Sequence, residues 1–191
     1  MNARAPQRRI VLTGFMCAGK TTVARALAAR LGCAMLDTDA ALVEREGRSI
    51  EAIIDADGEA RFRQIERDAL RAILERDRAR VIALGGGTWT VAENRALIAA
   101  HDCLTVWLDA PFALCWQRIA NSADARPLAR DRERALELYD ARRAAYELAA
   151  FRVEITQARS AQDTAAEIAS IIGRQNFSDE YEGQEEKNTH G

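Results

Sequence analysis

The segment GFMCAGKT at residues 14–21 decides the fold of this chain. It matches the pattern G-x-x-x-x-G-K-[S/T], follows the apolar run Ile10–Leu12 and opens a helical pattern. In that context the glycines permit a tight turn, and the backbone N–H groups of the turn converge on an anion at a helix N-terminus. Lys20 would reach the terminal phosphates, and the hydroxyl of Thr21 would coordinate Mg²⁺. We therefore expect the segment to bind a nucleoside triphosphate.

The composition of the chain is that of an ordinary soluble domain. Hydrophobic residues make up 48% and charged residues 29% of the 191 positions, so the chain can form a core and needs neither disorder nor a membrane. The formal net charge of −2 gives no electrostatic reason for a nucleic-acid partner. The four cysteines lie far apart and only two histidines are present, so reduced thiols are a simpler interpretation than a zinc site. We expect a cytoplasmic monomer.

The hydrophobic pattern beyond the opening segment alternates between buried strands and amphipathic helices. Strands are predicted at 9–13, 34–36, 81–84, 103–108 and 151–155. Helices are predicted at 20–31, 40–46, 50–57, 59–76, 92–100, 111–119, 134–149 and 164–174. This alternation predicts one three-layer α/β/α domain over residues 1–174, built on a five-stranded parallel sheet. Residues 175–191 are polar and acidic, and we expect them to form a disordered tail.

Three polar or glycine-rich segments follow strand ends and should line one rim of the sheet, where such folds bind ligands. They are the phosphate-binding segment, Asp37–Asp39 and Gly85–Gly87. Asp37 and Asp39 would share one side of an extended segment, so that one joins the Mg²⁺ shell and the other binds a substrate hydroxyl. The other interpretation, that these aspartates cap the following helix, is equally open. No acidic residue ends the strand at 81–84, which leaves Asp37 as the better candidate for the metal.

Glycines and arginines complete the predicted rim. Gly85, Gly86 and Gly87 would let a small ligand approach backbone N–H groups, and a flexible turn is the alternative interpretation. Arg63 lies on a long charged helix and is by itself more simply explained as a solvated charge. Arg126 lies in a polar loop, where a cation can fold over the transferring phosphoryl group and then withdraw.

These residues, taken in order, resemble the shikimate kinase family over about residues 9–172. The resemblance implies a P-loop kinase fold with a substrate-binding region at about 39–66 and a lid at about 120–132. It also implies phosphorylation of the 3-hydroxyl of shikimate by ATP with Mg²⁺, in aromatic amino-acid biosynthesis. Beyond the phosphate-binding segment, the motifs are Leu36–Asp39, Gly47–Ile50, Gly58–Glu59, Phe62–Arg63 with Glu66, Gly85–Gly87, Arg126–Leu128, and Arg142 four residues before Tyr146.

The resemblance assigns a role to each of these positions. Asp39 would bind the substrate hydroxyls and accept the proton. Arg63 and Arg142 would hold the shikimate carboxylate, because guanidinium forks match a planar carboxylate, and the run Gly85, Gly86 and Gly87 would contribute backbone. Lys20 and Arg126 would clamp the phosphates and act as catalytic residues together with Asp39. The remaining predicted ligands are Thr21 and Asp37 for Mg²⁺, and Gly14, Cys17, Ala18, Gly19, Lys20, Thr21, Thr22, Arg126 and Arg159 for the nucleotide.

Two positions depart from the family pattern, since Cys17 stands where a glycine is usual and Ala144 where a proline is usual. Cys17 puts a thiol inside the phosphate-binding turn, where N–H dipoles and Lys20 would make it reactive. Ala144 affects only local stiffness. Two other functions stay open at this point. One is another small-molecule kinase of the same fold, of the gluconate or nucleoside monophosphate type, and the other is a nucleotide-binding regulatory protein without catalysis.

Overall fold

Five strands form one parallel sheet in the computed structural model, which describes residues 8–121 and 131–188. The predicted five-stranded α/β architecture is thereby confirmed. The strands are β1 (Ile10–Thr13), β2 (Met35–Asp37), β3 (Val81–Ala83), β4 (Leu104–Asp109) and β5 (Phe151–Glu154), in the order β2-β3-β1-β4-β5. The helices are α1 (Lys20–Leu31), α2 (Thr38–Glu46), α3 (Ile50–Asp57), α4 (Glu59–Arg76), α5 (Ala92–Ala100), α6 (Phe112–Ala120), α7 (Arg132–Tyr146) and α8 (Ala161–Asn188), with a 3₁₀ turn, η1, at Thr88–Thr90.

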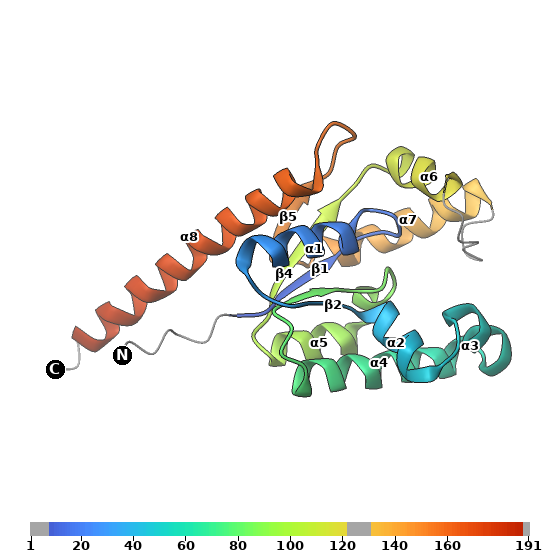
Figure 1. Ribbon diagram of the computed structural model, residues 1–191, viewed down its shortest axis with the longest axis horizontal. Coiled ribbons are helices and arrows are strands. Elements are labelled where there is room, and N and C mark those ends of the chain that lie inside the picture. The colour runs from blue at the N-terminus through green and yellow to red at the C-terminus, as the bar shows by residue number, and fades with distance from the viewer. Residues whose placement is uncertain (1–7, 122–130, 189–191) are drawn as a thin grey trace.

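The central strand of the sheet is β1, with β3 on one side and β4 on the other. Ile10 pairs with Val81 of β3 and with Leu104 of β4, and all three strands run in the same direction. Helices α1 and α8 pack together on one face of the sheet, while α4 and α5 cover the other (Figure 1). The loops that follow β1, β2 and β3 therefore meet at one rim.

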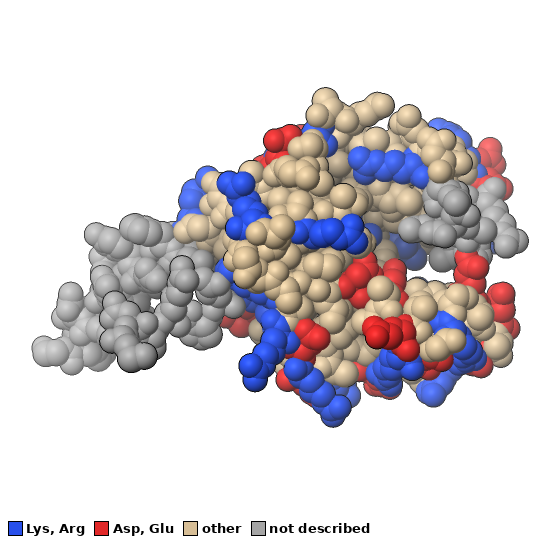
Figure 2. Space-filling view, viewed as in Figure 1, with Lys and Arg blue, Asp and Glu red and all other residues tan. Residues whose placement is uncertain are grey.

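The surface carries both signs of charge side by side. Figure 2 shows Lys and Arg side chains interspersed with Asp and Glu over the described part of the face in view. This mixture agrees with the formal net charge of −2. Among the helices that the structure describes, none combines the length and the apolar character that a membrane crossing requires.

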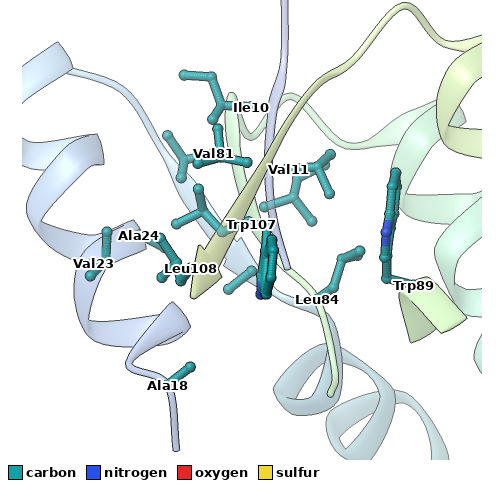
Figure 3. Packing of buried hydrophobic residues seen from close by; sticks show 14 of the residues in the cluster. Ile10, Val11, Ala18, Val23, Ala24, Val81, Leu84, Trp89, Trp107 and Leu108 are labelled. Carbon is teal, nitrogen blue, oxygen red and sulfur yellow. The ribbon is translucent and has the colours of Figure 1, made fainter. Parts of the chain in front are cut away.

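The main core is built around the strands, because parallel strands that are covered on both faces bury consecutive side chains. All residues of β1 and of β4 are buried. Figure 3 shows Val23 and Ala24 of α1 on one side of these strands and Trp89 of η1 on the other. The phosphate-binding segment is therefore anchored at both ends, by β1 before it and by the buried face of α1 after it.

A second, smaller hydrophobic cluster joins α2, α3 and the first half of α4. Its buried members are Leu42, Ile53, Phe62 and Ile65. These helices start directly after β2 and project from the sheet at the lower right of Figure 1. The region 39–66, in which the resemblance locates acceptor binding, thus has a hydrophobic cluster of its own.

Helix boundaries differ from the predicted ones in α2, α6, α7 and α8. Helix α6 is shifted by one residue from the predicted 111–119, and α7 ends at Tyr146 rather than at residue 149. Helix α2 begins at Thr38, because the side chain of Asp37 accepts hydrogen bonds from the first turn. Helix α7 begins at Arg132, since Asp131 caps it in the same way. Helix α8 runs on to Asn188, beyond residue 174, where we expected a disordered tail to begin. Its second half contains four glutamates and two glutamines, which are good helix formers, and a helix that is already nucleated extends at little cost.

Candidate active site

The turn after β1 needs glycine at two positions for different reasons. Gly14 has a φ of +139°, and a Cβ there would lie 2.6 Å from the carbonyl oxygen of Leu108. Gly19 has a φ of +101° and is the N-cap of α1. Within the described residues, no side chain caps this end of the helix. The first N–H groups of α1 are therefore available to an anion, as the motif predicts.

A cavity of about 580 Å³ opens at this helix end, a size suited to a small-molecule ligand. It brings together predicted residues from four separate segments of the chain. The predicted residues among those that line it are Cys17, Ala18, Gly19, Lys20, Thr21, Thr22, Asp37, Asp39, Gly86 and Arg159.

Lys20 folds back over the phosphate-binding turn. Its Nζ donates hydrogen bonds to the carbonyl oxygens of Gly14 at 2.8 Å and of Phe15 at 2.9 Å. The ammonium group is thereby held at the mouth of the turn, beside the N-terminus of α1. A phosphate bound at that N-terminus would lie within reach of this charge.

Asp37 makes two sets of contacts, one of which is the helix cap that the sequence left open as an alternative. Its Oδ1 accepts hydrogen bonds from the backbone N–H groups of Asp39 and Ala40, at 3.0 and 3.2 Å, and so caps α2. Its Oδ2 accepts a hydrogen bond from the hydroxyl of Thr21 at 2.5 Å. The cap fixes the carboxylate and leaves one oxygen beside the Thr21 hydroxyl. Hydroxyl and carboxylate oxygens are hard ligands that suit Mg²⁺, so the residues present fit that ion.

The glycine run after β3 is required by close packing rather than by unusual backbone angles, since none of its three residues has a positive φ. A Cβ on Gly85 would lie 2.2 Å from Oδ1 of Asp39 and 2.9 Å from the hydroxyl oxygen of Thr88. The backbone N–H of Gly85 donates a hydrogen bond to the hydroxyl of Thr38 at 2.8 Å. The carboxylate of Asp39 therefore packs directly against the backbone of the run.

Two guanidinium groups converge on the last glycine of the run. A Cβ on Gly87 would lie 2.9 and 3.2 Å from the two Nη atoms of Arg63, and 3.3 Å from Nη2 of Arg142. Arg63 comes from α4 and Arg142 from α7, so they are far apart in the sequence. Paired forks of this kind suit a planar anion. The structure thus brings together the two arginines that the resemblance assigns to a carboxylate.

Glu66 connects Arg63 to the glycine run. Its Oε2 accepts a hydrogen bond from Nη1 of Arg63 at 3.0 Å, and its Oε1 accepts one from the hydroxyl of Thr88 at 2.7 Å. The Glu66 carboxylate is buried, and a buried carboxylate needs such partners. A second ion pair joins Arg63 to Glu59 at 3.1 Å. Arg63 is therefore not merely a solvated charge, as its sequence context alone would suggest.

Of the other predicted arginines, Arg159 lines the cavity and Arg126 lies outside the described residues. Arg159 donates from Nη1 to the carbonyl oxygen of Glu154 at 2.9 Å and pairs with Glu167 through Nη2. A further cavity residue, Arg118, was missed by the sequence reasoning. Its Nη1 donates to the carbonyl oxygen of Cys17 at 3.0 Å. Nothing in the sequence distinguishes Arg118 from the many solvated helix arginines.

Cys17 occupies a left-handed backbone conformation, with a φ of +59°. Non-glycine residues seldom adopt this conformation, and it costs them roughly 1–2 kcal/mol. The Cys17 side chain is half-buried and lines the cavity. The departure at this position therefore leaves the turn intact and adds a thiol to the wall of the cavity.

The chain is similar to known shikimate kinases along most of its length. A family model described as shikimate kinase matches residues 16–173. The shikimate kinase of Salinibacter ruber is 37% identical over 185 residues, which cover 91% of this chain and 89% of that protein. The shikimate kinase of Geobacter sulfurreducens is 38% identical over 175 residues, with 90% and 94% covered.

Solved structures agree with these sequence matches. A shikimate kinase from Acinetobacter baumannii, in complex with shikimate, has a TM-score of 0.80 at 34% identity and covers 88% of this chain and 94% of its own. A gluconokinase from Sinorhizobium meliloti has a TM-score of 0.56 at 18% identity, covers 92% of this chain and 99% of its own, and shares the fold alone. The family model and the relatives above 30% identity thus lead to one assignment, and the chain belongs to the shikimate kinase family.

Proposed function

We propose that this chain transfers the γ-phosphoryl group of ATP to the 3-hydroxyl of shikimate, at the rim where β1, β2 and β3 end. The oxygen of the 3-hydroxyl attacks the γ-phosphorus, the bond from that phosphorus to the bridging oxygen of ADP breaks, and the hydroxyl proton passes to the Asp39 carboxylate. The products are shikimate 3-phosphate and ADP, in a step of aromatic amino-acid biosynthesis. Family membership makes the chain an ATP-dependent kinase with an alcohol acceptor.

The observation that carries the acceptor assignment is the convergence of Arg63 and Arg142 on Gly87, two residues from the glycine against which Asp39 packs. The two forks would bind the carboxylate of shikimate, and Asp39 would bind its hydroxyls. The backbone of Gly85 and Gly86 would approach the ring without an intervening side chain. Positioning of this kind supplies much of the rate of a phosphoryl transfer, because the reaction needs little covalent participation by the protein.

The phosphates would lie on the N-terminus of α1, with Lys20 exchanging loop carbonyls for phosphate oxygens. Thr21 and Asp37 would hold Mg²⁺, which neutralises charge on the phosphate oxygens when it is bound. Arg118 and Arg159, which line the same cavity, would contact the rest of the nucleotide. Arg126 would complete the clamp from the lid that the resemblance predicts at about 120–132.

The test is ATP consumption by the purified protein with shikimate, gluconate or nucleoside monophosphates as acceptor. We expect turnover with shikimate alone, and loss of turnover when EDTA removes Mg²⁺. Turnover with gluconate or with a nucleoside monophosphate, and not with shikimate, would show that shikimate is not the substrate. Binding of ATP without turnover of any acceptor would favour a regulatory protein.

We also propose that the chain works as a cytoplasmic monomer on this small molecule, without a nucleic-acid or membrane partner, and as one domain over residues 1–174. The mixed surface charge and the net charge of −2 support the absence of a nucleic-acid partner. One continuous sheet supports the single domain. Light scattering of the purified protein tests the monomer, since a dimer would have twice the mass of 21.1 kDa.

Gly87→Ala should raise the KM for shikimate about tenfold and leave the KM for ATP unchanged. The new methyl group would lie between the guanidinium groups of Arg63 and Arg142. These groups end flexible side chains and can move aside, but they would then no longer be placed to bind one carboxylate together. Steady-state kinetics with each substrate varied in turn measure both constants. Gly173→Ala is the matched control, because among the described residues nothing beyond its own stretch of helix lies within 4 Å of its Cβ position. An unchanged KM for shikimate would mean that the arginines bind no acceptor.

Cys17 should be alkylated by iodoacetamide in the free enzyme and protected when ATP and Mg²⁺ are bound. Its side chain lines the nucleotide cavity, whereas Cys33 is half-buried elsewhere and should react equally in both states. Cys103 and Cys115 should stay unmodified, because burial raises the pKa of each thiol to about 11. Peptide mapping by mass spectrometry resolves the four sites. Equal labelling of Cys17 with and without ATP would mean that Cys17 does not line the nucleotide site.

A further inference from the structure

Tyr146, the last residue of α7, contacts the glycine run from beneath the rim. Its side chain is only 2% exposed, and its ring stacks on Trp107 of β4 with centroids 6.2 Å apart. Its hydroxyl donates a hydrogen bond to the carbonyl oxygen of Gly86 at 2.6 Å. The hydroxyl is thus the one polar group of a tightly packed side chain, and its hydrogen bond goes to Gly86, the middle residue of the run.

The same hydroxyl lies beside Arg142, which precedes it by one helical turn. Burial raises the pKa of Tyr146, and the positive charge of the Arg142 guanidinium is close enough to the phenol to lower it against that larger rise. That guanidinium also faces the run, with Nη1 3.7 Å from the Cβ position of Gly86 and Nη2 3.3 Å from that of Gly87. A long arginine side chain has many rotamers, so the position of the peptide that it lies against restricts where the fork points.

A second hydrogen bond ties the same end of α7 to η1, the turn that follows the glycine run. The indole Nε1 of Trp89 donates to the carbonyl oxygen of Ala145 at 2.8 Å. Two adjacent residues at the end of α7 are therefore attached to this region, Ala145 to η1 and Tyr146 to the run, so the run cannot shift relative to α7 without disturbing the Tyr146 bond. The hydroxyl remains a donor at working pH, because burial raises the pKa of Tyr146 to about 12 although Arg142 lowers it.

We propose that Tyr146 is a positioning residue for the acceptor, whose hydroxyl fixes the peptide of Gly86 against which the fork of Arg142 lies. The proposal rests on the proposed function, in that the acceptor is taken to be a carboxylate bound by Arg142. Tyr146 touches neither substrate in this scheme. Its effect should appear in the binding of shikimate and not in the chemistry or in the binding of ATP.

The test replaces the hydroxyl alone. Tyr146→Phe should raise the KM for shikimate about tenfold, with kcat and the KM for ATP within about twofold of the wild type. Tyr139→Phe is the matched control on the same helix, because its hydroxyl donates to the carbonyl oxygen of Ala110 at 3.1 Å, away from the run. The control should leave the KM for shikimate unchanged.

A double-mutant cycle with Arg142→Ala shows whether Tyr146 acts through the arginine. With Arg142 absent, Tyr146→Phe should raise the KM for shikimate by less than about threefold, since interacting residues are not additive. Full additivity would overturn the proposal, and so would an unchanged KM in the single variant. Equal losses for both substrates with a lowered Tm would reveal a merely structural role. If the wild-type enzyme does not phosphorylate shikimate, the proposed function itself fails, which is a separate result.

Discussion

Asp39→Asn is expected to lower kcat with shikimate about a thousandfold, with the KM for ATP close to that of the wild type. The amide has nearly the shape of the carboxylate, so it can still pack against Gly85. It cannot accept the proton of the attacking hydroxyl, and it offers only one acceptor oxygen to the acceptor's hydroxyls. Stopped-time assays of ADP release, with each substrate saturating, measure this loss.

The matched control is Asp55→Asn on α3, an exposed aspartate within the same substrate-binding helices. It should keep full activity, because its side chain belongs to the solvent-facing side. If Asp39→Asn kept more than a tenth of the wild-type kcat, proton acceptance by Asp39 would contribute little. The residue would then act only by orienting the acceptor hydroxyls.

Arg63→Lys is expected to lower kcat/KM for shikimate at least about thirtyfold. Truncating one partner of a buried charge pair typically costs about 2–5 kcal/mol, and every 1.4 kcal/mol is a factor of about ten. Lysine restores the positive charge but not the fork, so it cannot bind a carboxylate and also satisfy Glu66. Most of the loss should appear as a higher KM for shikimate.

The control for this substitution is Arg71→Lys, which lies on the exposed side of the same helix. Its kinetic constants should match those of the wild type, since a solvated arginine exchanges for lysine at little cost. A wild-type KM for shikimate in Arg63→Lys would contradict the proposed carboxylate site. It would reduce Arg63 to a member of the ion pairs with Glu59 and Glu66.

The sequence was most informative where local rules decide the structure. The motif at residues 14–21 predicted a strand, a turn and a helix, and the boundaries of α1, α3, α4 and α5 follow from hydrophobic spacing and from the glycines between them. The start of α2 was predicted at Ala40 because Asp37–Asp39 was expected to be extended, and this was wrong: Asp37 caps the helix and Asp39 lies in its first turn. Asp37 also accepts a hydrogen bond from Thr21. Local patterns do not show that one carboxylate serves two partners.

The geometry of the rim depends on contacts between distant segments, which a single sequence does not reveal. Tyr146 and Gly86 are separated by 60 residues, and their hydrogen bond follows from how α7 packs on β4. Arg118 lines the cavity for a similar reason, since the end of α6 folds back over the turn at Cys17. The glycine run illustrates the same limit, because within the turn that they form its glycines leave room for Asp39 and for two arginines.

The small cluster of Leu42, Ile53, Phe62 and Ile65 has a consequence for how the protein opens in solution. Few buried side chains hold α2, α3 and the start of α4, whereas the sheet has a far larger core. Backbone amides in these helices should therefore exchange with deuterium sooner than those of β1 and β4. Shikimate, by bridging Arg63 of α4 to Arg142 of α7, should slow that exchange locally, and ATP alone should not. Binding of the acceptor would then stabilise α2, α3 and the start of α4, the least stable part of the fold.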